Sequence, residues 1–368
     1  MLKRIPITFQ VIVTFALATI GLFSLFHSTA LAEPIHNKIK VGFVIPLTGP
    51  AADYGVAVKN AVELGMQEIQ GASDHIEIIL DDAQYDFKLA ASSFNRLRSV
   101  VKADVIVVWG LAQCRVVAPI AELYKTPMIA LCLAKDVAKS RKFVLRFQSS
   151  VDEYMRTTAE WLGKQGKHKI GSLVADSPYT EEMYRAFERQ RLDSQSLVLL
   201  DRVSITSNDF YSQVTKVRRS GVDALGVFLG VGQIGTFAKQ LRGQSNGAQI
   251  FGTNIFGSRS ELVVAEGGLA GSYYADIELA PAFKERYTNR FGNDAQLGFG
   301  ALAYEILRVL TKVAADYRKE ESRPITILDA MVNAGEVASE IVGTYKIKED
   351  QEEGKHVRFP LQMIPVSQ

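Results

Sequence analysis

The stretch from Lys40 to Ile69 has the pattern of a strand, a loop and a helix in direct succession. Val41–Ile45 is an apolar run that ends at Pro46, and a loop of small residues follows it. Apolar residues then recur at helical spacing from Val56 to Ile69, which predicts an amphipathic helix. This order forms the first βα corner of an open α/β sheet, and such sheets bind ligands at the carboxyl ends of their strands. Nothing in the stretch indicates catalysis, so we interpret it as part of a site that holds a ligand.

Strands and helices alternate through the rest of the chain in two sets of similar length and order. The first set has strands at Ile39–Ile45, Ile76–Leu80, Val105–Trp109, Pro127–Leu131 and Val144–Phe147, with helices at Val56–Ile69, Lys88–Val101 and Val116–Tyr124. The second set has helices at Asp152–Gln165, Glu181–Arg191, Phe210–Ser220 and Gly235–Leu241, with strands at Lys169–Val174, Leu197–Val203, Ala224–Leu229 and Gln249–Phe251. Such alternation favours parallel sheets with right-handed crossovers. The predicted fold class is α/β, with two similar open parallel-sheet lobes.

The end of the chain is predicted to return to both lobes. The elements expected there are a segment near Ser272–Asp276, helices at Pro281–Phe291, Gly298–Arg318 and Ile325–Val332, and closing strands at Thr344–Ile347 and Arg358–Pro365. We assign residues 33–147 and 276–340 to the first lobe, and residues 148–275 and 341–368 to the second. No low-complexity linker separates the halves, so several short crossovers are expected, which is the geometry of a hinge.

The N-terminus has the features of a secretory signal. Lys3 and Arg4 precede the apolar run Ile5–Phe26, and Ala30–Ala32 has the small-x-small form of a cleavage site. We therefore expect residues 1–32 to be removed before Glu33 and the protein to reside in the periplasm. An uncleaved membrane anchor is the alternative, because the apolar run is nearly long enough to span ~30 Å of hydrocarbon.

Charge argues against a nucleic-acid partner. The whole chain carries 42 basic and 40 acidic residues, and residues 1–32 contain two of the basic residues and no acidic one. The remaining chain is therefore neutral, with 42 − 2 = 40 basic against 40 acidic residues. A nucleic-acid-binding protein normally has a basic excess.

The segment Gly230–Gly235 reads G-x-G-x-x-G between a predicted strand and a predicted helix. The dinucleotide fingerprint also requires an acidic residue about 20 residues further on. Residues 236–260 contain no Asp or Glu, and Asn254 stands where that acid would be. We interpret the segment as a glycine-rich loop that lines a cleft, with helix N–H groups free to bind a polar ligand atom. No cofactor is expected.

Other catalytic and metal-binding signatures are also missing from the sequence. No H-x-x-x-H or C-x-x-C motif occurs, and the five His residues are scattered. Asp81 and Asp82 follow a strand and could form a carboxylate pair, but a solvated loop or a helix cap is the stronger interpretation. We expect no metal site and no enzymatic activity.

Cys114 and Cys132 are the two cysteines, and each follows a predicted strand. If those strands are neighbours, both thiols face the same edge of the sheet. A disulfide, two free thiols in a pocket wall and two unrelated apolar side chains are all open, and an oxidising compartment favours the disulfide slightly.

The chain resembles the type 1 periplasmic binding proteins of the leucine/isoleucine/valine class, which serve ABC importers. The resemblance covers nearly all of the chain after the leader. It rests on PLTGPAADYG (Pro46–Gly55), DDAQYD (Asp81–Asp86), DSPYTEEM (Asp176–Met183) and NDFYSQVTKVRRSGVDAL (Asn208–Leu225). It implies a two-lobed protein that captures a small molecule between its lobes and delivers it to a membrane permease.

The resemblance also implies which residues contact the ligand. Tyr54 and Tyr179 stand where the family has cleft tyrosines. Departures occur at Cys114 and Ala134, which replace hydroxyl side chains, and at Asn254, which replaces the acid that neutralises the ligand's ammonium. The full set of expected ligand-contacting residues is Tyr54, Gln113, Cys114, Cys132, Ala134, Tyr179, Gly230 and Asn254.

These departures predict a ligand that is less polar than an amino acid. A buried ammonium requires a carboxylate nearby, because burying an unpaired charge is very costly. We therefore expect an aromatic or aliphatic acid, an amide or a lipid-like molecule, with an amino acid as the alternative. Two further alternatives are a periplasmic sensor that signals to a membrane receptor and, less favoured, an enzyme with a site centred on Cys114.

Overall fold

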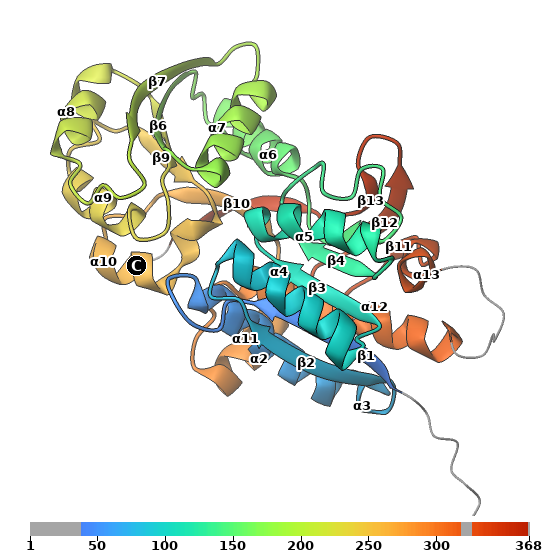
Figure 1. The fold of residues 1–368 in the computed structure, drawn as a ribbon. Helices are drawn as coiled ribbons and strands as arrows, with labels where there is room; N and C mark the ends of the chain where they lie inside the picture. The colour runs from blue at the N-terminus through green and yellow to red at the C-terminus, as the bar shows by residue number, and fades with distance from the viewer. Residues whose placement is uncertain (1–37, 318–325, 367–368) are drawn as a thin grey trace, which may run out of the picture. The chain divides into compact units, whose positions relative to one another are not determined.

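The computed structural model describes residues 38–317 and 326–366. The predicted leader, residues 1–32, lies outside this range. Among the described helices, none combines the length and the apolarity needed to cross a membrane. The described chain forms two sheets with helices packed on both faces of each (Figure 1).

The first sheet has eight strands in the order β11-β12-β13-β5-β4-β3-β1-β2. Neighbouring strands from β13 to β2 are parallel, whereas β11 and β12 are antiparallel to their partners. The bounds are β1 (Ile39–Ile45), β2 (Ile76–Asp82), β3 (Val105–Trp109), β4 (Met128–Leu131), β5 (Val144–Arg146), β11 (Glu336–Val337), β12 (Tyr345–Asp350) and β13 (Gly354–Arg358).

The second sheet has six strands in the order β14-β10-β9-β8-β6-β7. All neighbouring pairs are parallel except β10 with β14. The bounds are β6 (Lys169–Ala175), β7 (Ser196–Val203), β8 (Ala224–Phe228), β9 (Gln249–Gly252), β10 (Tyr273–Ile277) and β14 (Leu361–Pro365).

Helices cover both faces of each sheet, and this explains why central strands are apolar throughout. On β3, Val107 packs in the core under α2, α11, α12 and α13, while Val108 packs in the core under α4 and α5. The second sheet lies between α8–α10 on one face and α6–α7 on the other. The bounds are α2 (Ala52–Glu68), α3 (Ala72–His75), α4 (Phe87–Arg96), α5 (Leu111–Leu123), α6 (Val151–Lys164), α7 (Pro178–Gln190), α8 (Tyr211–Ser220), α9 (Ile234–Leu241), α10 (Arg259–Ala265), α11 (Pro281–Phe291), α12 (Leu297–Tyr317) and α13 (Ile327–Asn333).

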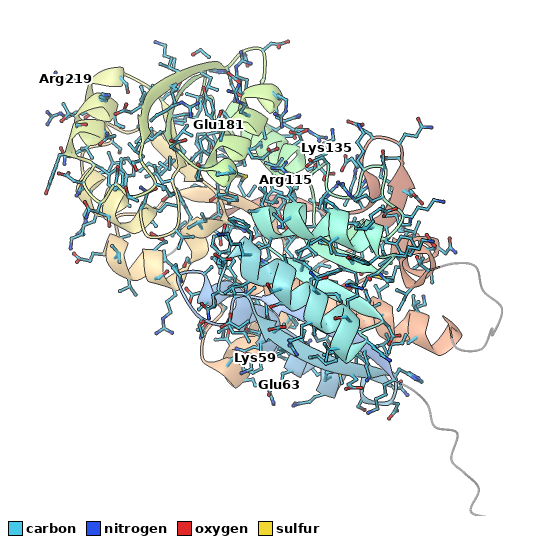
Figure 2. The ribbon with its side chains drawn as sticks, viewed as in Figure 1. Lys59, Glu63, Arg115, Lys135, Glu181 and Arg219 are labelled. Atoms are coloured by element: carbon cyan, nitrogen blue, oxygen red, sulfur yellow. The ribbon has the colours of Figure 1, made fainter. Side chains whose placement is uncertain are left out.

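Charged side chains occupy the outer faces of these helices. Lys59 and Glu63 are exposed on α2, and Arg219 is exposed on α8 (Figure 2). The opposite face of α2 carries Val58 and Val62, which are buried in the first core. This amphipathic pattern is the sequence signal from which the helix was predicted.

The chain passes between the two sheets three times. Several short crossovers were expected from the sequence. The crossings follow β5, β10 and β13. Two of them are joined by hydrogen bonds, because the Phe359 N–H donates to Ser149 Oγ at 2.9 Å and the Ser149 hydroxyl donates to the Phe359 carbonyl at 3.4 Å. We refer to the first sheet with its helices as the first lobe, and to the second sheet with its helices as the second lobe.

The C-terminal segment does not follow the expected boundary between the lobes. Residues 341–368 were assigned to the second lobe, but β12 and β13 belong to the first sheet and only β14 joins the second. The reason is packing, since Tyr345, Ile347 and Val357 of this hairpin are buried in the first core. The single strand predicted at Arg358–Pro365 is therefore two short strands in different sheets.

Candidate functional site

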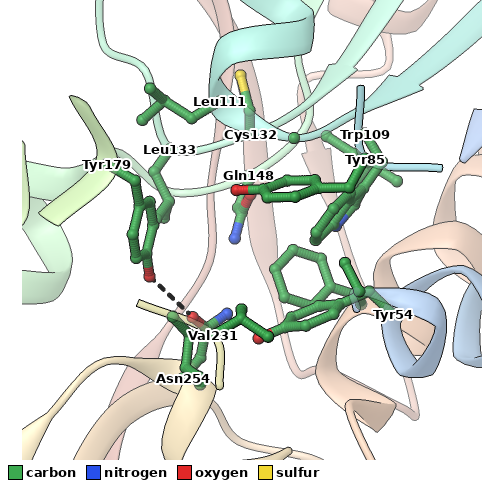
Figure 3. Close-up of a pocket in the computed structure, with 15 residues that line it drawn as sticks. Tyr54, Tyr85, Trp109, Leu111, Cys132, Leu133, Gln148, Tyr179, Val231 and Asn254 are labelled. Carbon is green, nitrogen blue, oxygen red and sulfur yellow. Dashed lines mark hydrogen bonds between the residues drawn. The ribbon is translucent and has the colours of Figure 1, made fainter. Parts of the chain in front are cut away.

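A cavity lies where the carboxyl ends of strands from both sheets converge (Figure 3). Loops after β2, β3 and β4 line it from the first lobe, and loops after β6, β8 and β9 line it from the second. Its volume is about 40 Å³, which is room for only a few water molecules. Its lining is Ala51, Tyr54, Tyr85, Trp109, Gly110, Leu111, Leu131, Cys132, Leu133, Gln148, Tyr179, Val231, Asn254, Ile255 and Phe299.

Aromatic rings from four separate segments form the first-lobe wall of this cavity. The Tyr54 ring lies 4.7 Å from the Trp109 ring and 5.4 Å from the Phe299 ring, measured between centroids. Trp109 also contacts Tyr85 at 5.5 Å and Phe299 at 5.6 Å. Tilted and edge-on pairs at these distances are favourable arrangements. The cluster therefore presents a preformed aromatic surface to a ligand.

Tyr85 reaches the cavity because its loop adopts an unusual backbone conformation. Gln84 and Tyr85 both have positive φ, at 50° and 61°. Asp82 holds the loop by accepting hydrogen bonds from the Gln84 N–H at 2.9 Å and the Thr48 hydroxyl at 2.6 Å. The Gln113 side chain holds its other end by donating to the Tyr85 carbonyl at 2.7 Å. Left-handed conformations in non-glycine residues persist only where surrounding contacts support them.

The polar groups of the cavity are uncharged. Among the residues that the structure describes, no Asp, Glu, Lys or Arg lines it. The Tyr179 hydroxyl donates to Asn254 Oδ1 at 3.3 Å, and both residues come from the second lobe. Among the described residues, Trp109 Nε1 and Gln148 Oε1 are buried without a hydrogen-bond partner. A ligand atom in the cavity can therefore satisfy an indole N–H and an amide oxygen that the chain itself leaves unpaired.

Burial keeps the cavity tyrosines neutral. It raises the pKa of Tyr54 well above its ordinary value, and neighbouring Tyr179 and Tyr85 raise it further. Burial also raises the pKa of Tyr85 and of Tyr179. All three phenols therefore keep their protons near neutral pH and act as hydrogen-bond donors as well as acceptors.

The residues singled out from the sequence divide into two groups. Tyr54, Cys132, Tyr179 and Asn254 line the cavity. Gln113, Cys114, Ala134 and Gly230 are outside the lining: Gln113 supports the Tyr85 loop, while Cys114 and Ala134 are packed in the core under α4 and α5. Gly230 does not line the cavity, but the next residue, Val231, does. The direct contact of these residues with a ligand stays a prediction.

Tyr54 reaches the cavity from a helix, although the sequence placed it in a loop. α2 begins at Ala52 rather than at Val56, so Tyr54 occupies its first turn. Gly55 makes this early start possible, because an added Cβ there would lie 1.9 Å from the Pro46 carbonyl oxygen. Only glycine allows the strand end and the helix to approach this closely.

Cys114 and Cys132 are free thiols in the structure, both fully buried. The strands before them, β3 and β4, are hydrogen-bonded neighbours, as the prediction of a shared edge required. Of the three arrangements considered, the structure has two adjacent free thiols, with Cys132 in the cavity wall and Cys114 behind it. The slightly favoured disulfide is not formed.

The expectation that the Gly230–Gly235 loop offers free helix N–H groups is wrong. The buried Glu261 carboxylate accepts hydrogen bonds from the amides of Gly232 and Gly235, the latter at 2.7 Å. An internal carboxylate therefore occupies the position where an anionic ligand would bind. The glycines serve packing instead, since a Cβ on Gly235 would lie 2.5 Å from the Glu261 carbonyl oxygen.

Asp81 and Asp82 have separate structural roles and do not form a carboxylate pair. Asp81 pairs with Arg96 at 2.6 Å, while Asp82 braces the loop after β1. The helix cap expected near this position is Asp86, which accepts from the N–H groups of Lys88 and Leu89.

Several lining residues escaped the sequence analysis, among them Tyr85, Trp109, Gln148 and Phe299. Tyr85 and Trp109 carried a usable signal, because each lies at or just beyond the carboxyl end of a predicted strand. Phe299 had no such signal, since it belongs to a long helix near the C-terminus and reaches the cavity only through tertiary packing.

The model of the periplasmic binding protein family matches residues 38–359. The chain belongs to this family. The match covers the first two crossings and every described strand except β14, and it agrees with the resemblance drawn from Pro46–Gly55 and the other motifs. By its description, the family is one of periplasmic binding proteins.

Known family members with similar sequences or structures differ in what they bind. The Leu/Ile/Val-binding protein BraC3 of Rhizobium johnstonii is 26% identical over 239 residues, which is 61% of this chain and 64% of that protein. The leucine-binding protein LivK of Thermotoga maritima has a TM-score of 0.76 at 18% identity, with 89% of this chain and 95% of that one covered. A solute-binding protein of an ABC transporter from Rhodopseudomonas palustris, solved with 4-hydroxybenzoate, has a TM-score of 0.75 at 18% identity, covering 90% and 94%.

The match to the curated relative spans less than two thirds of that relative's length. The solved structures, at these low identities, establish a shared two-lobed fold. They confirm the predicted fold class of two open, mainly parallel sheets.

Proposed function

We propose that this protein captures a small, mainly apolar aromatic ligand between its two lobes and delivers it to a membrane permease of the ABC type. The observation that carries this proposal is the cavity lining, which combines five aromatic residues with no charged side chain. Such a lining disfavours an amino acid, because a desolvated ammonium without a nearby carboxylate is very costly. A protein that binds its ligand in the periplasm and releases it to a permease when its lobes open needs no catalytic group.

A single carboxylate on the ligand is compatible with the cavity. Gly110 and Leu111 line it at the point where α5 begins, and the amino end of a helix favours a negative charge. The tyrosine hydroxyls and the unpaired Trp109 N–H are further donors. The chemistry of the lining therefore matches best an aromatic monoacid such as a benzoate, with a neutral aromatic amide as the next candidate. Because the cavity has a volume of only about 40 Å³ in this form, the lobes must move apart to admit either ligand.

Isothermal titration calorimetry with 4-hydroxybenzoate, benzoate and leucine tests this proposal. We expect micromolar or tighter binding of a benzoate and no measurable binding of leucine. Tight binding of leucine or another free amino acid would overturn the ligand class. Native mass spectrometry of protein purified from its periplasm offers an unbiased check, because a co-purified ligand gives its own mass.

Replacing Asn254 by aspartate provides a sharper test of the charge argument. Asn254→Asp keeps the side-chain shape but places a carboxylate in the cavity, so affinity for a benzoate should fall more than tenfold. Asn246→Asp is a matched control, because Asn246 is exposed and lies outside the cavity lining. Equal affinities for the two variants would show that the ligand does not contact this wall.

A further inference from the structure

The pair Cys114 and Cys132 has no part in the function proposed above, yet its arrangement is typical of reactive thiols. Cys132 follows β4 directly and lines the cavity, while Cys114 lies in the first turns of α5 and is 0% exposed. The two cysteines follow hydrogen-bonded neighbouring strands and are packed in the same core, and each thiol shifts the pKa of the other. A reagent that enters the cavity can therefore meet Cys132, whereas Cys114 is accessible only from the side of Cys132.

The surroundings of the two sulfur atoms favour a negative charge on Cys132. The Ala134 N–H donates to the Cys132 sulfur, and two cations, Arg146 on β5 and Arg115 on α5, are near it. The Cys114 thiol instead donates to the Val108 carbonyl oxygen at 3.1 Å. Because this bond needs the thiol proton, it favours the protonated form of Cys114.

These surroundings set the pKa values of the two thiols apart. Burial alone would raise the pKa of Cys132, but the neighbouring Cys114 thiol, the Ala134 amide and the two arginines lower it. Burial raises the pKa of Cys114 well above its ordinary value, and the adjoining Cys132 raises it further. A thiolate, rather than a thiol, is the nucleophile in thiol–disulfide exchange.

We propose that Cys132 and Cys114 form a dithiol–disulfide site in the wall of the ligand cavity, where Cys132 reacts with a small-molecule disulfide and Cys114 resolves the adduct. In the first step the Cys132 thiolate attacks one sulfur of the disulfide R–S–S–R, which forms a mixed disulfide and releases RS⁻. In the second step Cys114 loses its proton and attacks the Cys132 sulfur, which releases the second RS⁻. The two cysteines lose two protons and two electrons in total, and R–S–S–R is reduced to two thiols.

The site would connect the start of α5 to the loop after β4. Leu111 at the start of α5 and Leu133 after β4 both line the cavity. The disulfide therefore ties two parts of the cavity wall together. Because the cavity admits only a few water molecules in this form, the reaction requires the lobes to move apart.

Peptide mass spectrometry after incubation with oxidised glutathione tests the proposal on the folded, full-length protein. We expect a Cys114–Cys132 disulfide with no retained glutathione in the parent protein. Cys114→Ser should retain one glutathione on Cys132, because the resolving thiol is missing. Cys132→Ser should leave Cys114 unmodified over the same time.

Three outcomes would overturn the proposal. The first is glutathione on Cys114 of the Cys132→Ser variant at the parent rate. The second is a parent protein whose thiols react only after unfolding in urea. For the third outcome, the proposal expects the rate of iodoacetamide alkylation of Cys132 to reach half its plateau at a lower pH than for an ordinary thiol. A rate that depends on pH as an ordinary thiol's does would contradict it. Cys114→Ala and Cys132→Ala, checked by circular dichroism, separate these outcomes from a failure of the serine variants to fold.

Discussion

Asp276, at the end of β10, is a carboxyl group without a cationic partner among the described residues. It lines a second cavity of about 340 Å³, together with Tyr274 and Gln296. Its Oδ1 atom accepts one hydrogen bond, from the Ile277 N–H at 2.8 Å, and its Oδ2 atom lies against Gly298 at the start of α12. Burial raises the pKa of Asp276 to about 7, and the Ile277 hydrogen bond offsets only part of this rise.

This raised pKa predicts that stability falls as pH rises. The folded protein holds a proton on Asp276 up to about pH 7, whereas the unfolded chain releases it near pH 4. Between these values the folded state binds more protons, so the free energy of unfolding decreases with pH. A difference of about three pKa units corresponds to about 4 kcal/mol above both pKa values, so Asp276→Asn should remove this slope and stabilise the protein by up to about that amount at pH 8 relative to the parent. Urea denaturation at about pH 5 and about pH 8 measures the effect. The same change in the free energy of unfolding between these pH values in both proteins would contradict the prediction.

Single residues also show where sequence reasoning was sufficient. Tyr54 and Asn254 were placed in a ligand site from motif positions alone, and both line the cavity. Gln113 was placed there too, but its side chain turns to the Tyr85 carbonyl. The direction of a side chain depends on its rotamer and neighbours, which a one-dimensional pattern does not contain.

At the scale of elements, the glycine-rich loop before α9 depends on a carboxylate from α10. Glu261 is 2% exposed and accepts from the amides of Gly232 and Gly235. These amides belong to the unpaired N–H groups that every helix start presents. The Glu261 side chain therefore links the loop, α9 and α10, in addition to their apolar packing.

Truncating this side chain should destabilise the second lobe. Glu261→Ala leaves two buried amides without a partner and creates a cavity, so we expect a loss of about 3 kcal/mol in the free energy of unfolding. Glu266→Ala, directly after the same helix, is the control, because it removes only exposed ion pairs with Lys239 and Arg242 and should shift the urea midpoint much less. A similar loss in both variants would show that the Glu261 hydrogen bonds contribute little.

Element boundaries differ from the sequence prediction where a local contact overrides periodicity. α2 begins four residues early because Gly55 lets it approach Pro46. Arg358–Pro365 reads as one apolar strand, but its two ends pair with different sheets. Period and propensity give the type of an element, while its ends are set by the contacts made there.

At the scale of the whole molecule, a few polar contacts join the two lobes next to the cavity. Arg115 on α5 pairs with Glu182 on α7 at 3.3 Å (Figure 2 labels Arg115). The Ser258 hydroxyl, at the start of α10, donates to Asp53 on α2 at 3.1 Å. The Gln296 side chain donates to the Asn254 carbonyl at 3.1 Å. These contacts favour the arrangement in which the cavity is nearly closed.

Removing two of these contacts should shift the ligand-free protein towards an open form. The double variant Glu182→Gln/Ser258→Ala loses about 1 kcal/mol of interaction in total, which corresponds to roughly a fivefold change in the closed-to-open ratio. Small-angle X-ray scattering should then give a larger radius of gyration than for the parent. Glu181→Gln is a matched control, because Glu181 pairs with Arg185 and Arg202 within the second lobe. An unchanged radius in the double variant would show that other contacts hold the lobes.

The sequence by itself determined the α/β class, the two repeated sets of elements and the edge at which the cavity lies. It could do so because strand and helix periods are local, and because parallel strands bring their carboxyl ends together. Tertiary structure decided that Phe299 and Gln148 complete the cavity, that β12 and β13 join the first sheet, and that Glu261 occupies the amides of the glycine-rich loop. Each of these depends on a contact between residues far apart in the chain. The stretch from Lys40 to Ile69 shows both sides, since its pattern predicted a corner that holds a ligand, while the packing of Gly55 on Pro46 placed Tyr54 in the cavity.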